Sequence, residues 1–168
     1  LEVHRIARRY TFSARVRSHY LRHLADRPFD LVIEALNKVP VFTPVWSGRR
    51  CVLVVHHLFG ATAFREAPMP IAAATWLLER PISRVYQGVP VEAISVSTAD
   101  DLVARGLRRQ DIQVIYPGVD LDFFIPDPSV VRPATPTFLY LGRLKRYKGI
   151  HLILRALARV RRNGMECR

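Results

Sequence analysis

Cysteine is scarce in this sequence of 168 residues, and so are long hydrophobic runs. The two cysteines, Cys51 and Cys167, are too few for a disulfide scaffold or a cysteine-based zinc site, and they suggest a reducing compartment. The longest charge-free apolar stretch, residues 67–78, is too short to cross a bilayer and contains two prolines. Hydrophobic residues make up 49% of the chain and charged residues 24%, so the composition is that of a globular protein rather than a disordered one.

Acidic residues are also few, because 14 Asp and Glu face 26 Lys and Arg, which gives a net charge of +12. A positive net charge favours binding to nucleic acid, to an anionic membrane surface or to phosphorylated substrates. Lysine occurs at 38, 145 and 148 alone, so 26 less 3 leaves 23 arginines, a skew typical of GC-rich genomes. The basic residues are dispersed and accompany no nucleic-acid-binding motif. We therefore expect a solvated basic surface and no nucleic-acid partner, with a basic anion- or nucleic-acid-binding module as an alternative.

Apolar runs and helical patterns alternate along the chain. Turn residues separate them, and Pro81 predicts a kink in the longest helical pattern. The pattern predicts strands at 29–34, 51–55, 93–97 and 112–116, and helices at 12–25, 69–87 and after 97, the last capped by Ser97 or Thr98. Such alternation is typical of an α/β fold with a parallel, Rossmann-like sheet.

Five prolines within residues 117–136 indicate a linker. A further strand at 137–141 and a helix starting near Lys148 are expected after it. We therefore predict a first domain over 1–130 and the start of a second over 131–168. Because one strand and one helix cannot bury a core, and because the chain begins with Leu1, we expect a piece of a longer polypeptide.

The segment Leu141–Gly149 (LGRLKRYKG) lies between a predicted strand and a predicted helix, a place where parallel sheets bind ligands. Arg143 offers a planar fork for two phosphate oxygens, and Lys148 offers a point charge. Gly142 and Gly149 allow the backbone to approach a ligand closely. The pattern predicts a diphosphate site, and the alternative is a basic surface loop with glycines at its turns.

The string Tyr140-Leu-Gly-Arg-Leu144, followed by Lys148-Gly149 and an apolar helix, resembles the opening of the C-terminal domain of family-4 retaining glycosyltransferases. Residues 114–126 (VIYPGVDLDFFIP) resemble the interdomain linker of that family, with Pro117 where the family has Asn. Residues 54–57 (VVHH), 94–97 (ISVS) and 30–40 (DLVIEALNKVP) resemble three segments of its N-terminal domain.

The resemblance implies an incomplete GT-B architecture, made of most of an N-terminal acceptor-side domain and the first β-α unit of a C-terminal donor domain. It implies transfer of a hexose, with retention and without metal or cofactor, from a nucleotide sugar such as a GDP- or UDP-hexose to a glycan or lipid-linked acceptor. It also implies a cytoplasmic location. The basic helix 12–25 either touches the inner face of the membrane or forms a solvated surface.

The resemblance implies roles for single residues. Arg143 and Lys148 would stabilise the leaving nucleoside diphosphate, and Gly142 and Gly149 would line its site. His56 would contact the donor sugar or orient the acceptor, rather than its neighbour His57, whose side chain points the opposite way on an extended strand. Gly118 and Asp120 would shape the floor of the cleft, and the alternative is that they form a hinge turn. Glu34 and Asn37 would face the acceptor, and the alternative is that they belong to a strand end and a turn.

Two parts of the family pattern fall outside this sequence. The glycine-rich loop would precede Leu1, and the paired-glutamate motif would follow Arg168, so the isolated chain is expected to be inactive. No acidic pair suits a metal-bound diphosphate, because Asp100 and Asp101 are explained by a helix N-terminus. A GT-B enzyme of different chemistry, such as a sugar-nucleotide epimerase, remains an alternative.

Overall fold

The computed structural model describes residues 2–8, 11–36, 39–144 and 148–168, and within them the chain divides into two compact units. The first unit is Leu1–Gly118 and the second is Val119–Arg168. The division falls inside the proline-rich stretch that the sequence marks as a linker, and the expected boundary near residue 130 stays a prediction.

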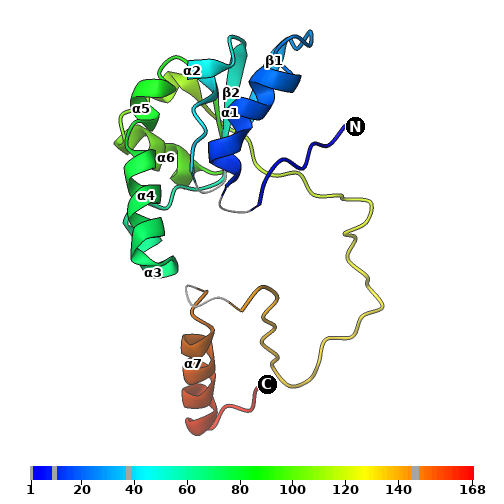
Figure 1. Cartoon of the computed structure of the whole chain (residues 1–168). Helices are drawn as coiled ribbons and strands as arrows, with labels where there is room; N and C mark the ends of the chain where they lie inside the picture. Colours follow the sequence, from blue (N-terminus) through cyan, green and yellow to red (C-terminus); the bar gives the residue numbers. More distant parts are fainter. Residues whose placement is uncertain (1, 9–10, 37–38, 145–147) are drawn as a thin grey trace. The chain divides into compact units, whose positions relative to one another are not determined.

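The first unit is a four-stranded parallel sheet with helices packed against it (Figure 1). Its strands are β1 (Leu31–Leu36), β2 (Arg50–Val55), β3 (Val91–Ala93) and β4 (Ile112–Val114), in the order β1-β2-β3-β4. Its helices are α1 (Phe12–His23), α2 (Thr43–Trp46), η1 (Gly60–Thr62), α3 (Ala63–Glu66), α4 (Met69–Glu79), α5 (Ile82–Val85), α6 (Val96–Ala104) and η2 (Arg109–Asp111). The predicted α/β class with a parallel sheet is confirmed.

One face of the sheet carries the hydrophobic core. Side chains alternate along β1, so Glu34 and Leu36 are buried while Ile33 is 62% exposed on the opposite face. Leu53 and Val55 of β2 continue the buried face, and the largest side chains packed among them from the helices are Ile82, Tyr86 and Leu102. Burying each such side chain stabilises the fold by about 1.5–3 kcal/mol.

The helix boundaries follow local chemistry. Pro81 does more than kink the expected helix 69–87, because it separates α4 from α5. Gly106, with φ of 99°, follows the end of α6 as predicted, since a left-handed residue suits glycine there. The expected strand 93–97 is wrong in its bounds, because β3 ends at Ala93 and Ser95 already caps α6.

The second unit contains helix α7 (Ile150–Arg162), which begins close to the predicted position. The strand expected at Thr137–Leu141 is not formed, and Leu139 and Leu141 are 87% and 92% exposed. A strand needs a neighbour to satisfy its backbone. Among the described residues, the segment is tied to the C-terminus by two bonds: Phe138 N–H donates to the carbonyl of Arg168 at 2.7 Å, and Arg168 N–H donates to the carbonyl of Pro136 at 3.0 Å.

Candidate active site

The carboxyl ends of parallel strands share one edge of the sheet, and this edge holds His56 and His57 after β2 and Ser95 after β3. Both imidazoles are exposed, and the ring of His57 lies edge-on to Phe59 with centroids 4.7 Å apart. The carbonyl of His56 accepts a hydrogen bond from Thr98 Oγ1 at 3.2 Å. The backbone of His56 is thus fixed to the start of α6, while its side chain stays accessible.

Ser95 organises the start of α6. Its Oγ accepts a hydrogen bond from Thr98 N–H at 3.2 Å and lies 2.9 Å from Thr98 Oγ1 and 3.0 Å from Ser97 Oγ. Ser95 is therefore the N-cap, rather than Ser97 or Thr98 as the sequence suggested. The reason is that β3 ends at Ala93, four residues before the predicted end of the strand, so the helix also begins earlier.

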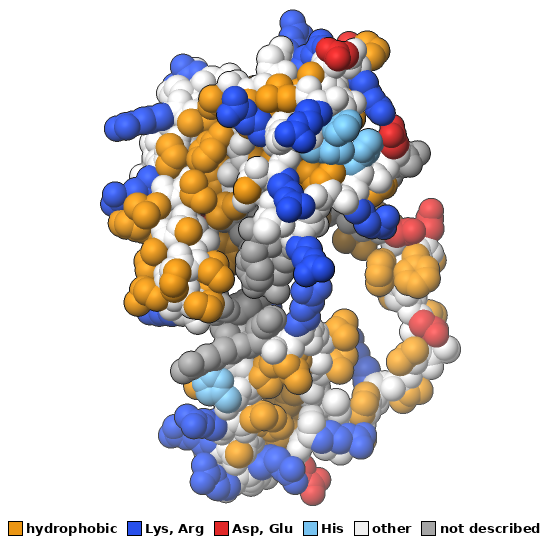
Figure 2. All heavy atoms as spheres, in the orientation of Figure 1, with side chains coloured by type: hydrophobic (Ala, Val, Ile, Leu, Met, Phe, Trp, Pro, Cys, Tyr) orange, Lys and Arg blue, Asp and Glu red, His pale blue; other side chains and the backbone are white. Residues whose placement is uncertain are grey.

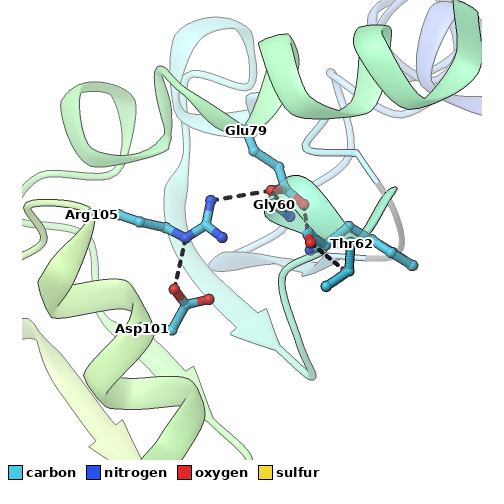
Figure 3. A network of polar contacts seen from close by, with 6 residues as sticks. Gly60, Thr62, Glu79, Asp101 and Arg105 are labelled. Carbon is cyan, nitrogen blue, oxygen red and sulfur yellow. Dashed lines mark hydrogen bonds and ion pairs between the residues drawn. The ribbon is translucent and has the colours of Figure 1, made fainter. Parts of the chain in front are cut away.

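Glu79 anchors the loop that follows His57 (Figure 3). Its carboxylate, on a side chain that is 1% exposed, accepts hydrogen bonds from the N–H groups of Phe59 and Gly60, both at 2.8 Å. Arg105, the C-cap of α6, neutralises it at 3.1 Å and also binds Asp101 at 3.1 Å. The buried Glu79 carboxylate thus accepts three hydrogen bonds, one of them from the Arg105 cation, which compensates its charge. This network holds the loop in place.

Glu34 performs the same task for the loop after β1. Its buried carboxylate accepts hydrogen bonds from Val41 N–H at 2.7 Å, from Thr43 N–H at 2.9 Å and from the hydroxyl of Tyr86 at 2.8 Å. These bonds occupy the side chain inside the fold, so the interpretation of Glu34 as an acceptor-facing residue stays a prediction without a contact to carry it. Asn37, its expected companion, lies outside the described residues.

Tyr86 connects strand β1 to the loop that follows it. It is fully buried, donates to Glu34 and accepts a hydrogen bond from Phe42 N–H at 3.0 Å. Burial raises the pKa of the Tyr86 hydroxyl far above its ordinary value, and the nearby Glu34 carboxylate raises it further. Tyr86 therefore remains protonated and serves as a structural donor.

Sequence reasoning missed Glu79, Arg105 and Tyr86. Glu79 lies at the end of an otherwise apolar helix, and its partner Arg105 follows 26 positions later in the chain. The neighbouring sequence therefore does not indicate that these two side chains pair. The one available hint was that Glu79 is the sole acidic residue between 67 and 91, a region rich in apolar side chains.

In the second unit, Gly142, Arg143, Lys148 and Gly149 precede helix α7 in the chain. The hydroxyl of Tyr140 donates to the carbonyl of Arg143 at 2.9 Å, and a Cβ on Gly142 would lie 3.0 Å from that hydroxyl. Gly149, with φ of 66°, is the N-cap of α7. The side chains of Arg143 and Lys148 are exposed. Their role in binding a diphosphate stays a prediction.

The two linker residues singled out in the sequence lie on either side of the division between the units. Gly118 is the last residue of the first unit. Asp120 Oδ1 accepts hydrogen bonds from the N–H groups of Asp122 and Phe123, both at 3.1 Å, which forms a local turn. This geometry accounts for Asp120 as a turn residue, and its place in a cleft stays a prediction.

Metal-ligating side chains do not gather anywhere in the described ranges, in the sense that no three His, Cys, Asp or Glu residues there could hold an ion together. Both cysteines are free. None of the helices in the described part of the chain is long and apolar enough to span a membrane.

Comparisons with known proteins agree with this architecture. The family model described as Glycosyltransferase Family 4 matches residues 1–123. The lipopolysaccharide 1,6-galactosyltransferase of Salmonella typhimurium is 43% identical over 54 residues, which are 32% of this chain and 14% of that protein. The aligned stretch thus spans a small part of the relative's length. No solved structure matches the chain. On the strength of the family match, which covers well over half its length, the chain belongs to glycosyltransferase family 4.

Proposed function

We propose that this chain is part of an enzyme that transfers a hexose from a nucleoside-diphosphate sugar to a glycan or lipid-linked acceptor, with retention of configuration and without a metal. The family match over residues 1–123 carries the proposal. The similarity to a galactosyltransferase that is named for lipopolysaccharide supports a glycan or glycolipid acceptor. The proposal puts the reaction in the cytoplasm, and at the inner face of the membrane where the acceptor is lipid-linked.

The candidate site residues have different roles in the proposed transfer. In the transfer, the bond between the anomeric carbon and the diphosphate oxygen breaks, and a bond to the acceptor hydroxyl oxygen forms as that hydroxyl passes its proton to the departing diphosphate. Arg143 and Lys148 stabilise the negative charge that gathers on the leaving diphosphate, since exposed cations beside glycine backbone can reach it. His56, accessible at the carboxyl edge of the sheet, hydrogen-bonds the donor sugar or orients the acceptor.

The test is kinetic and uses a preparation of the intact protein that shows sugar transfer. Arg143→Ala and Lys148→Ala are each expected to lower kcat by about 10²-fold or more, because a charge-stabilising donor is lost in the transition state. Arg155→Ala, which removes an exposed arginine of α7, is the matched control and should leave kcat unchanged. Near-normal kcat in both site variants would contradict the diphosphate assignment.

A further inference from the structure

The peptide group between His56 and His57 lies just beyond the end of the sheet. The pairing of β2 with both of its neighbours ends at Val55, whose carbonyl accepts a hydrogen bond from Ile94 N–H at 3.3 Å. The next carbonyl along the chain, that of His56, accepts instead from the hydroxyl of Thr98 at 3.2 Å. A buried side chain of α6 thus supplies the hydrogen bond at the position where strand pairing stops.

These two hydrogen bonds fix the direction in which the His56 side chain leaves the backbone. A peptide group is planar, so a hydrogen bond to its carbonyl orients the whole plane. The Val55 carbonyl belongs to the plane before the His56 Cα, and the His56 carbonyl belongs to the plane after it. When both planes are held, φ and ψ of His56 are set and its Cα–Cβ bond has one direction. The Thr98 hydroxyl therefore fixes ψ of His56.

Thr98 is itself held so that its hydroxyl points at this carbonyl. Its side chain is 8% exposed, and its single hydroxyl proton goes to His56 because a carbonyl can only accept. The Ser95 hydroxyl, at 2.9 Å, must then donate to Thr98 Oγ1, while Ser95 Oγ accepts from Thr98 N–H at 3.2 Å. Such linked hydrogen bonds strengthen one another, which keeps the Thr98 hydroxyl in this orientation.

The contacts of Glu79 do not replace the Thr98 bond. Glu79 holds the N–H groups of Phe59 and Gly60, which lie three and four positions after His56. Rotation at the two intervening residues can absorb a turn of the peptide group next to His56. The loop is therefore held at each end by a different side chain, and Thr98 holds the end that carries His56.

Charge alone does not orient a substrate on the first unit. Figure 2 shows Lys and Arg side chains spread over the drawn face of this unit rather than gathered over one element. Dispersed positive charge attracts an anionic substrate without fixing its direction. Orientation requires side chains that are held in defined positions by their surroundings. His56, exposed at the carboxyl edge of the sheet, meets this requirement when its backbone is held.

We propose that Thr98 is a positioning residue for sugar transfer, whose hydroxyl fixes the peptide group after His56 and thereby aims the His56 imidazole at the bound sugar or acceptor. The proposal rests on the function proposed above, in which His56 contacts one of these two. Thr98 acts through His56, because its own hydroxyl is occupied inside the fold. Loss of that hydroxyl lets the imidazole point elsewhere, which slows the reaction without removing a substrate contact.

The first measurement is ¹⁵N relaxation of the full chain, which needs no substrate. The reporter is the amide of His57, because its N–H shares a peptide plane with the His56 carbonyl. Thr98→Val keeps the size and branching of the side chain but lacks the hydroxyl, so the order parameter of this amide is expected to fall from about 0.85 to below about 0.6. Thr98→Ser, which keeps the hydroxyl, should restore it.

Thr75→Val is the matched control for the loss of a buried hydroxyl. Thr75 is 7% exposed, and its hydroxyl donates within its own helix to the carbonyl of Ile71 at 2.9 Å. This variant should leave the His57 order parameter unchanged. Circular dichroism checks that each variant is folded, and Thr98→Ala is a second variant without the hydroxyl in case Thr98→Val does not fold.

The second measurement is the rate of sugar transfer by a preparation of the intact protein. Thr98→Val is expected to lower kcat by about tenfold, Thr98→Ser to restore it, and Thr75→Val to leave it unchanged. His56→Ala gives the loss that belongs to His56 itself. The double variant Thr98→Val/His56→Ala should be no slower than His56→Ala alone, because Thr98 acts through a side chain that this variant lacks.

Three results would overturn the positioning role of Thr98 alone. They are an unchanged His57 order parameter in Thr98→Val, a normal kcat in Thr98→Val beside a slow His56→Ala, and additive losses in the double variant. A normal kcat in His56→Ala is a separate result, since it would remove the role proposed for His56 and the positioning role with it. The two failures are therefore distinguishable.

Discussion

At the scale of single residues, two buried carboxylates hold the loops at the candidate site. Glu34 and Glu79 each accept two main-chain hydrogen bonds from the loop that follows a strand, and each adds one side-chain donor, Tyr86 or Arg105. Neither carboxylate is available to a substrate in this arrangement. Their effect on catalysis would be indirect, through the position of the loop backbone.

Replacing Glu79 should loosen the loop that follows His57. We expect Glu79→Ala to lower the free energy of unfolding by about 3 kcal/mol, because two N–H groups and a partly buried arginine lose their acceptor. Urea denaturation measures the loss, and amide hydrogen exchange at Phe59 and Gly60 should accelerate. Asp101→Asn, which removes the exposed partner of Arg105, should cost only about 0–1 kcal/mol. Equal losses in the free energy of unfolding in the two variants would contradict the role of Glu79 in holding the loop.

Tyr86 should make the fold sensitive to alkali. Its pKa is raised in the folded state, so above the ordinary tyrosine pKa of about 10 the unfolded chain releases a proton that the folded chain retains. Stability is therefore fully present below that pH and falls as the pH rises above it. Tyr86→Phe should cost about 1–3 kcal/mol at neutral pH and flatten the alkaline decline in urea midpoints. Tyr116→Phe, at a 67% exposed position, should leave both unchanged.

At the scale of elements, apolar runs in the sequence predicted the strands correctly where a neighbouring strand is present to pair with them. The runs 29–34 and 51–55 correspond to β1 and β2 because each strand pairs along its whole length. The equally apolar run 137–141 forms no strand, since no neighbouring strand is there to pair with it. Periodicity thus reports which residues prefer burial, whereas formation of a strand depends on distant partners.

The start of α6 can be tested by substitution. Ser95→Ala should destabilise the fold by about 1 kcal/mol, because Thr98 N–H loses its acceptor at the helix N-terminus. Ser97→Ala should have a much smaller effect, since Ser97 is exposed inside the helix and its hydroxyl pairs with the Ser95 hydroxyl rather than with a helix N–H group. Thermal unfolding of the two variants distinguishes the positions, and a larger loss in Ser97→Ala would place the cap where the sequence suggested.

At the scale of the whole molecule, the sequence predicted the sheet class and the family but not how the site is held. His56, Arg143 and Lys148 could be singled out because they belong to contiguous motifs. The Glu34–Tyr86 pair, by contrast, is 52 positions apart, so only the folded chain brings it together. The apolar stripe predicted for α7 is present but unburied, because the second unit contains no further layer in its described residues to cover it.

The division between the units should be visible to a protease. Residues 119–136 form no regular element, and Phe123 and Phe124 are 77% and 65% exposed. Brief chymotrypsin treatment should cleave there first and leave a fragment close to Leu1–Gly118 that resists further digestion. Mass spectrometry identifies the fragment. First cleavage within the β-sheet unit would mean that this unit is not stably folded.

The two carboxylate anchors also bear on how far the candidate site can diverge. Glu34 and Glu79 bind the main-chain N–H groups at positions 41, 43, 59 and 60, so these hydrogen bonds do not themselves depend on the side chains at those positions. At positions 41 and 59 any amino acid except proline, which lacks the N–H, preserves the bond. Gly60 is restricted to glycine, because its φ is 50° and a Cβ there would lie 2.9 Å from Nη2 of Arg105, and the buried side chain of Thr43 restricts that position too. Related enzymes, or an engineer, can therefore exchange the loop side chains to suit a new sugar or acceptor while the loop backbone keeps its place.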